Sequence, residues 1–546
     1  MKSYLTVFAE QIAVIQENVD QLYDDQFIET CAEWAVPYIG DLIGYKSLHN
    51  INTSKISQRA EVANTIAYRR RKGTAVVLEQ LARDVTGWPA SVVEFFQVMA
   101  ATQYMNHKRL FNHYAPDLRD WQTLEYVGTA FDRVAHTADV RHIDNDQGRH
   151  NIKNIGIYLW RLQNYSLTKS PLVSIEPGHY YFSPLQHDLA LFNKPVPEKK
   201  ITHLARPNNV PAPISLRTMH DDIGLFYGRG KSVAIYNAFN AVDEEYLLVS
   251  VSEIHVCCLA DQDGNWINDP EDGVIAIDPE TGRIALGSDL IVDNMDMWAD
   301  FYYGFSADIG GGEYKRGEQF DTELNTIETV ASPQIIQSAL DSLAGEGVVE
   351  ITDTGRYVET PLINVNASTR IEIRAANQHR PLLLLNDELL ITGGNDSSVT
   401  LDGLVIAGGR IRVPANNNGL RILRLRHCTL VPGLNLDALG NPTNPGEASI
   451  LIESANVKLE IENCILGGIR TAEGVEVKIN NTVIDANDSS NVSYAAVDDF
   501  SAGGSLTIRN STVIGKVHTR VMELASNCIF DAELALLGES WLSPLL

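Results

Sequence analysis

The sequence predicts a multidomain fold with an α-helical N-terminal region, a β-rich middle region and a C-terminal right-handed parallel β-helix. Three observations support this prediction: a short phrase recurs near the C-terminus, apolar residues near the N-terminus have helical spacing, and short alternating runs lie between them. At 546 residues the chain also exceeds what one hydrophobic core usually supports. We place the regions at 1–125, 126–330 and 331–546.

The recurring phrase defines the predicted solenoid. It reads LRLRHCTL at residues 423–430, LEIENCIL at 459–466, VKINNTVI at 477–484 and LTIRNSTV at 506–513. Each copy alternates apolar and polar residues, as a strand with one buried face does. Two looser copies extend the series to six. Counted at one fixed position of the phrase, successive copies are 24, 36, 18, 29 and 17 residues apart, which suits solenoid turns with inserted loops. That position holds Gly403, His427, Asn463, Asn481, Asn510 and Asn527.

The N-terminal region predicts helices. Leu5, Phe8, Ile12, Ile15 and Val19 recur at three- and four-residue steps and therefore form one apolar helix face. Further helices are predicted for residues 27–34, from about residue 54 through residue 68, for 74–85 and for 92–99.

The middle region predicts short strands and turns. Residues 276–286 indicate a hairpin whose loop places Gly282 at positive φ. The polar stretch 318–329 predicts a linker, and residues 332–343 predict a short helix that closes one end of the solenoid. We expect the apolar tail 541–546 to cover the other end.

Composition narrows the class of protein. The formal net charge of −27 argues against a general nucleic-acid binder, because such proteins neutralise phosphates. The N-terminus has no long apolar run that would predict a secretion signal, and nothing predicts a membrane span. Six cysteines favour a reduced protein made in the cytoplasm. They do not have the spacing of a zinc site. We expect neither a metal nor a cofactor.

Several phrases in the first 320 residues resemble a known family. They are YDDQFIETCAEWAVPYIGDLIG at 23–44, YRRRKGTAVVLEQLARDVTGWP at 68–89, FDRVAHTADVR at 131–141 and YGFSADIGGGEY at 303–314. In this order they resemble the phage tail protein I-like baseplate wedge subunits of contractile injection systems.

The resemblance implies a structural role without enzymatic activity. A subunit of this family joins two copies of a baseplate J-like partner through a helical bundle, and six wedges surround a central hub. Partners would then include J-like subunits, the hub and the proteins that initiate sheath and tube, within a six-fold hetero-oligomeric, phage-tail-like particle. The C-terminal β-helix is a departure from the short phage members of the family.

The candidate partner-binding residues are of two kinds. Phe8, Ile12 and Ile15 belong to the apolar helix face. Arg69, Arg70, Arg71 and Lys72 form the only basic cluster, which we interpret as a source of ion pairs inside an assembly rather than as a nucleic-acid or membrane contact.

Two possible metal sites are weak in sequence. The Asp261–Asp272 segment resembles a calcium loop, but Trp266 replaces the glycine of the sharp turn and Asp272 replaces the bidentate glutamate. His107, His113, His136 and His142 have no metal-ligand spacing, and we interpret them as ordinary histidines.

The alternative function is a tailspike-like β-helix that binds or cleaves a glycan. Such cleavage needs paired carboxylates, and Asp485, Asp488, Asp498 and Asp499 form the only credible cluster. Neither histidine nor a basic residue lies beside this cluster in sequence, so we predict no catalytic residues. Residues 331–546 are expected to fold alone and to be dispensable for wedge assembly.

Overall fold

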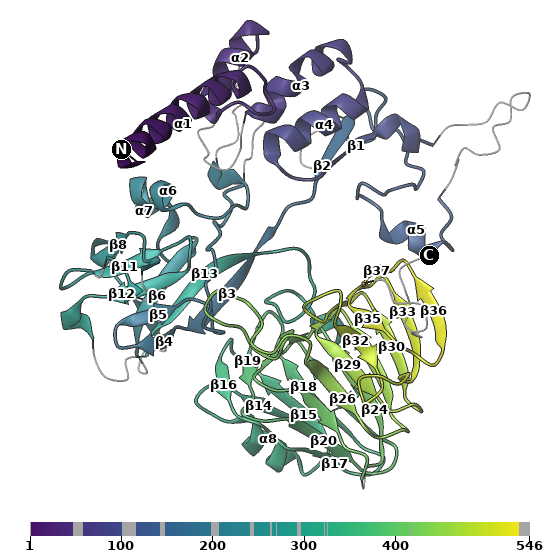
Figure 1. Cartoon of the computed structure of the whole chain (residues 1–546). Helices are drawn as coiled ribbons and strands as arrows, with labels where there is room; N and C mark the ends of the chain where they lie inside the picture. The colour runs from purple at the N-terminus through teal and green to yellow at the C-terminus, as the bar shows by residue number, and fades with distance from the viewer. Residues whose placement is uncertain are drawn as a thin grey trace, which may run out of the picture. The chain divides into compact units, whose positions relative to one another are not determined.

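The computed structural model describes residues 2–46, 58–100, 116–141, 148–197, 207–240, 245–262, 265–268, 270–291, 296–321, 323–324, 326–416 and 418–533. The chain divides into two compact units, Met1–Arg161 and Leu162–Leu546 (Figure 1). The β-rich region and the β-helix thus belong to the same unit. The expected cover of the last turn by residues 541–546 lies outside the described residues.

The first unit begins with helices. These are α1 (Lys2–Asp24), η1 (Glu33–Ala35), α2 (Val36–Leu42), α3 (Arg59–Arg70) and α4 (Ala75–Thr86). Gly87 ends α4 at φ 70°, a conformation that glycine adopts without a steric penalty. A small core of Cys31, Ala35, Val36 and Val62 holds α2 against α3.

The prediction of a helix over residues 92–99 is wrong. The segment forms β1 (Ala90–Glu94) and a 3-10 turn η2 (Phe95–Val98), and β1 pairs antiparallel with β2 (Ile155–Leu159). Val92 and Val93 are β-branched and suit a strand, whereas so short an apolar run does not separate helix from strand by its spacing. Between the two strands the structure describes one short helix, α5 (Trp121–Glu125).

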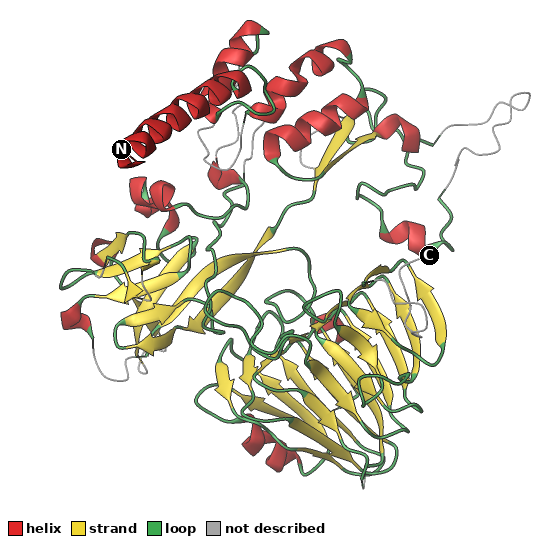
Figure 2. Cartoon of the chain, viewed as in Figure 1, coloured by secondary structure: helices red, strands yellow, loops and turns green. Residues whose placement is uncertain are grey.

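Two antiparallel-rich sheets open the second unit (Figure 2). One has the order β3-β13-β6-β7 and the other β4-β5-β12-β11-β8. The predicted hairpin is confirmed, because β11 pairs antiparallel with β12 and Gly282 has φ 69°. The elements are β3 (Gln163–Pro171), β4 (Val173–Glu176), β5 (His179–Tyr181), η3 (Pro207–Asn209), α6 (Leu216–Asp221), α7 (Ile223–Phe226), β6 (Val233–Asn240), β7 (Glu245–Leu248), η4 (Val251–Glu253), β8 (Ile254–Val256), β9 (Asp261–Gln262), β10 (Asn265–Trp266), β11 (Ile275–Asp278), β12 (Arg283–Leu286), η5 (Ser288–Leu290) and β13 (Trp298–Phe305).

The C-terminal region is a parallel β-helix built from three sheets of nine, eight and seven strands. The first sheet contains β14 (Ile327–Val330), β15 (Gly347–Ile351), β18 (Arg370–Ala375), β21 (Ser397–Asp402), β24 (Leu420–Arg426), β27 (Lys458–Glu462), β30 (Glu476–Asn480), β33 (Ser505–Arg509) and β36 (Met522–Ser526). The second contains β16 (Arg356–Val358), β19 (Leu382–Leu384), β22 (Val405–Ala407), β25 (Thr429–Leu430), β28 (Ile465–Leu466), β31 (Val483–Asp485), β34 (Thr512–Ile514) and β37 (Ile529–Asp531). The third contains β17 (Ile363–Val365), β20 (Leu389–Gly393), β23 (Ile411–Val413), β26 (Ala448–Ile452), β29 (Gly468–Thr471), β32 (Val492–Ala495) and β35 (Lys516–Val517).

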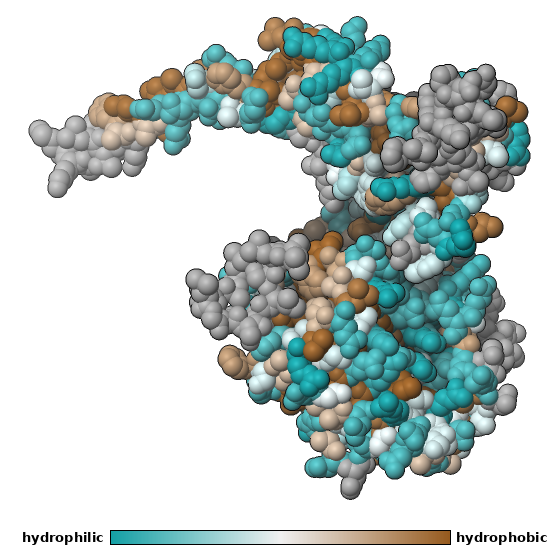
Figure 3. All heavy atoms as spheres, turned by 90° about the vertical axis from the view of Figure 1, so that its right-hand side faces the viewer, coloured by the Kyte–Doolittle hydropathy of each residue, from teal (hydrophilic) through white to brown (hydrophobic). Residues whose placement is uncertain are grey.

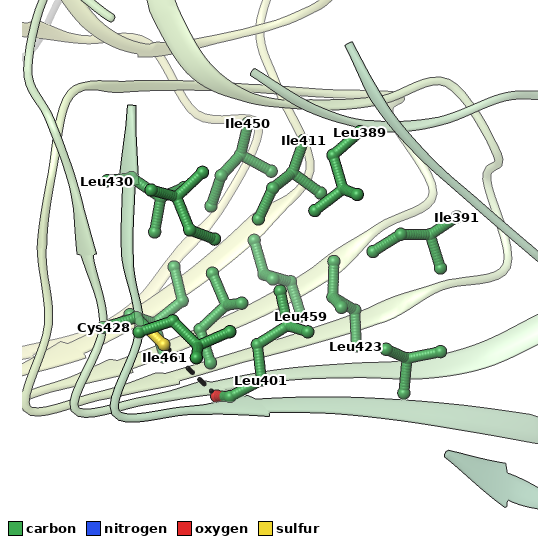
Figure 4. Close-up of a cluster of buried hydrophobic side chains, with 14 of the residues drawn as sticks. Leu389, Ile391, Leu401, Ile411, Leu423, Cys428, Leu430, Ile450, Leu459 and Ile461 are labelled. Carbon is green, nitrogen blue, oxygen red and sulfur yellow. Dashed lines mark hydrogen bonds between the residues drawn. The ribbon is translucent and has the colours of Figure 1, made fainter. Parts of the chain in front are cut away.

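The repeated phrase sets the register of the first sheet. Leu423 pairs with Leu459, Leu459 with Val477 and Val477 with Leu506, so equivalent positions lie one above the other. Leu423 and Leu459 point into a continuous aliphatic core with Leu401, Ile411 and Ile450 (Figure 4). Val477 and Leu506 belong to the same core. Buried Cys428 occupies the small-residue position of the phrase, and its thiol donates to the Leu401 carbonyl at 3.4 Å.

One position of the phrase holds asparagine in four of the six copies, and we call it the Asn-like position. The chain turns a corner there, with the backbone in the left-handed region. Its φ values are 75° at Gly403, 48° at His427, 53° at Asn463, 47° at Asn481, 49° at Asn510 and 54° at Asn527. Asparagine tolerates this region better than most residues and also bonds to its neighbours. The amide of Asn481 donates to Asn463 Oδ1, and that of Asn527 donates to Asn510 Oδ1 at 3.2 Å.

The N-terminal end of the β-helix is closed by α8 (Ile336–Leu343), as predicted, with Ile336, Leu340 and Leu343 in the core. The linker prediction is wrong for Ile327–Val330, because this segment is strand β14 and pairs with β15. Its single Ile and Val gave too short an alternation to indicate a strand. Residues 306–320, which include the turn η6 (Gly317–Gln319), lie against the β-helix, and we call them the strap.

Candidate functional sites

The apolar face of α1 is exposed in this chain. Ile12, Ile15 and Val19 are 61%, 62% and 58% exposed, and Phe8 is 59% exposed. Brown apolar side chains are visible on the surface of the helical part in the space-filling view (Figure 3). A helix face of this kind usually packs against another element, so α1 is a candidate docking surface.

The basic cluster lies at the end of α3. Arg69 donates to the Ile43 and Gly44 carbonyls at 2.8 and 2.6 Å and therefore stabilises the C-terminal end of α2. Arg70, Arg71 and Lys72 are exposed. The cluster therefore divides into one residue with a role inside the chain and three that face solvent.

The calcium-like segment is only partly described. Asp263, Gly264 and Asp269 lie outside the described residues, whereas the flanking strands β9 and β10 pair antiparallel. Asp272 accepts a hydrogen bond from Ser288 Oγ at 2.6 Å.

Three of the four candidate carboxylates of the β-helix accept hydrogen bonds within their own loops, and the fourth, Asp499, pairs with a residue of strand β29. Asp485 accepts from the Asn487 amide at 2.8 Å, and Asp499 pairs with Arg470. Hydrogen bonds from Ser490 lower the pKa of Asp488, and those from Ser501 lower the pKa of Asp498. A general acid needs a raised pKa, so these last two carboxyls are poorly suited to that role.

A cavity of about 450 Å³ lies where the β3 sheet meets the first β-helix turns. Glu313 of the strap lines it and accepts from Ser166 Oγ, Thr168 N and Thr354 Oγ1 at 2.8, 2.7 and 2.7 Å. Lys169, at φ 54°, lies 3.2 Å from Asp300. These ionic groups are occupied in holding the sheet, the strap and the β-helix together.

One cluster in the first unit was missed by sequence reasoning. Asp132, His136 and His150 each offer a ligand atom, and these atoms lie within 4.8 Å of one another. His136 Nε2 is 2.8 Å from Asp132 Oδ2, and the two imidazole rings stack with centroids 3.9 Å apart. Burial and the charge of His136 lower the pKa of His150. The fourteen-residue gap to His150 follows no known ligand spacing, so only the fold reveals this cluster.

No protein-family model, curated protein or solved structure matches the chain at the thresholds of comparison. Among the described residues, none of the helices combines the length and apolar character needed to cross a bilayer. The fold defines a class of protein with two compact units. A helical N-terminal region comes first in the sequence, and a β-rich region and a parallel β-helix together form the second unit.

Proposed function

We propose that the chain is a structural baseplate wedge subunit of a contractile injection system or related phage-tail-like particle. In this proposal the α1 face binds a J-like partner, and the right-handed β-helix is a peripheral module. The chain is made in the cytoplasm and then incorporated into the particle. The observation that carries the proposal is the exposed apolar face of α1.

The magnitude of this exposure favours an assembly role. Complete burial of one such side chain contributes about 1.5–3 kcal/mol. Four residues that are each about 60% exposed therefore represent a gain on the order of 4–7 kcal/mol on docking, before the entropy cost of association. The family resemblance implies that such a subunit joins its J-like partners through a helical bundle.

The glycan-directed alternative has less support. Of the aromatic residues of the β-helix, Tyr357 and Tyr494 are buried at 5% and 1% exposure, and Phe500 is exposed at 74%. Trp541 lies outside the described residues. A sugar-stacking groove usually has several exposed rings. Asp485, Asp488 and Asp498 already accept hydrogen bonds within their own turns, and Asp499 is paired with Arg470.

Co-expression with a J-like baseplate protein tests the proposal. We expect the full chain and a 1–305 truncation, which removes both the strap and the β-helix, to co-elute with the partner in gel filtration. A variant that lacks residues 2–24 should elute alone. Recovery of the full chain only as a separate monomer would contradict the proposal, and polysaccharide cleavage by the full chain would favour the alternative.

A further inference from the structure

The Asp132, His136 and His150 cluster has the composition of a metal site. Two imidazole nitrogens and one carboxylate oxygen form a donor set that suits zinc and related transition-metal ions. The Asp132 side chain is 7% exposed and that of His136 is 20% exposed. We propose that these three residues bind one Zn²⁺ ion per chain, with a fourth position for water.

Backbone hydrogen bonds fix the positions of the three candidate ligand residues in the absence of an ion. The amide of His136 donates to the Val98 carbonyl at 2.8 Å, and the Ala100 amide donates to the His136 carbonyl at 2.7 Å. The Asp139 amide donates to the His150 carbonyl at 2.8 Å. Asp132 is fixed through Oδ1 by the Val134 amide and through Oδ2 by the Gly128 amide. Such second-shell bonds orient ligands and strengthen metal binding.

The geometry requires only side-chain adjustment. Donors of a tetrahedral zinc site lie about 3.4 Å apart, given bonds of about 2.0–2.2 Å. The present atoms lie within 4.8 Å of one another, and we expect the stacked rings to rotate when an ion binds.

The surrounding fold explains why a metal is useful here. Across the described residues 126–141 and 148–154 there is neither a helix nor a strand, only the bridge between Met99 and His136. Phe131, Val140 and Ile152 are 59%, 91% and 74% exposed, so little apolar surface is buried. Small segments with a poor core often depend on a metal for order. Zinc would cross-link residues 132–136 to residue 150.

The test uses the tag-free full chain, stripped with EDTA. Isothermal titration with Zn²⁺ should show one site per chain, whereas Mg²⁺ should give no heat. Co²⁺ as a probe should produce the visible absorption of a four-coordinate complex. His136→Gln and His150→Gln should each weaken Zn²⁺ binding by more than about tenfold, and the exposed His255→Gln control should bind as the unsubstituted chain does.

Three outcomes would overturn the inference: absence of stoichiometric Zn²⁺ binding, absence of the Co²⁺ band, or unchanged affinity in His150→Gln. The last outcome would leave Asp132 and His136 as a simple hydrogen-bonded pair. The Co²⁺ spectrum of the unsubstituted chain decides the question even if a variant fails to fold. Because the site does not involve α1, its failure would not affect the proposed assembly function.

Discussion

Arg316 of the strap and Asp402 of the β-helix face each other inside the protein, with Nε and Oδ1 3.8 Å apart and side chains 0% and 1% exposed. The guanidinium also donates to the Gly312 and His379 carbonyls at 2.9 and 3.0 Å. At 3.8 Å the pair is too long for a hydrogen bond. Burial raises the pKa of Asp402 to about 7, and the Arg316 charge compensates only in part. The strap is thus attached to the solenoid by a buried charge.

Replacement of Arg316 by methionine should destabilise the second unit by about 3–5 kcal/mol, because the buried Asp402 loses the largest of its compensating charges. The loss should grow with pH above about 7, since the buried carboxyl must then stay protonated or ionise unpaired. Urea unfolding at pH 6 and pH 8 measures both effects. The exposed Arg421→Met control should change stability by less than about 0.5 kcal/mol. In the double variant Arg316→Met with Asp402→Asn, the loss of stability should no longer depend on pH. An unchanged pH dependence in the double variant would contradict the pairing of Arg316 with Asp402.

His427 should make the second unit sensitive to acid. Burial and the charge of Arg316 lower its pKa from 6.5 to about 4, and it bonds to Tyr314 and Gln319. The unfolded chain therefore binds a proton between pH 6.5 and pH 4 that the folded chain does not. Stability is full above pH 6.5 and falls toward pH 4 by up to about 3 kcal/mol.

His427→Asn should remove this loss of stability at low pH, because asparagine does not titrate. Asparagine also fits the position, since it occupies the equivalent corner of later turns. Thermal unfolding of both proteins between pH 4 and pH 7 provides the comparison. Asp402 is present in both, so its contribution cancels in the difference. Parallel pH profiles for the two proteins would contradict this prediction, because they would show that folding does not lower the pKa of His427.

At the corner position of the repeat, glycine and alanine should differ in their effect on stability. Asn481 has φ 47°, where a Cβ atom costs about 1–2 kcal/mol unless the side chain compensates. Asn481→Ala should therefore be less stable than Asn481→Gly by about that amount, although both lose the bond to Asn463. Urea unfolding of both variants measures the difference, and equal stabilities would show that the bond alone selects asparagine.

The strap changes how the β-helix should be isolated. The earlier expectation that residues 331–546 fold alone stays a prediction, but that fragment lacks Arg316 and leaves Asp402 buried without its partner. A fragment of residues 306–546 should melt cooperatively and at a higher temperature than 331–546, as measured by circular dichroism. Equal melting temperatures would mean that the strap contributes no stability.

The sequence predicted the solenoid because its period is local and repeated. Leu459 and its equivalents fall on one face, and the six residues that the repeat aligns at one position all have positive φ. The strap was not predicted, although the copies contained a signal. Gly403 and His427 depart from asparagine where the strap lies, since a Cβ at Gly403 would approach Arg316 Cζ to 2.5 Å and His427 bonds to Tyr314.

The cluster of Asp132, His136 and His150 and strand β1 were missed for different reasons. Asp132 and His150 are brought together by loops, and loops have no periodicity that reports which residues meet. Val92 and Val93 form a strand because β2 supplies a partner more than sixty positions further along the chain. In both cases long-range contacts decide the structure.

The central claim is that α1 uses its apolar face to bind a J-like partner, and the affinity of matched variants tests it most directly. Ile12→Ser with Ile15→Ser changes the apolar face, whereas Ala13→Ser with Glu17→Ser changes other sides of the same helix. Calorimetric titration with the purified partner should show that the first variant binds about 100-fold more weakly and the second as the unsubstituted chain does. Equal affinities for all three proteins would contradict the account.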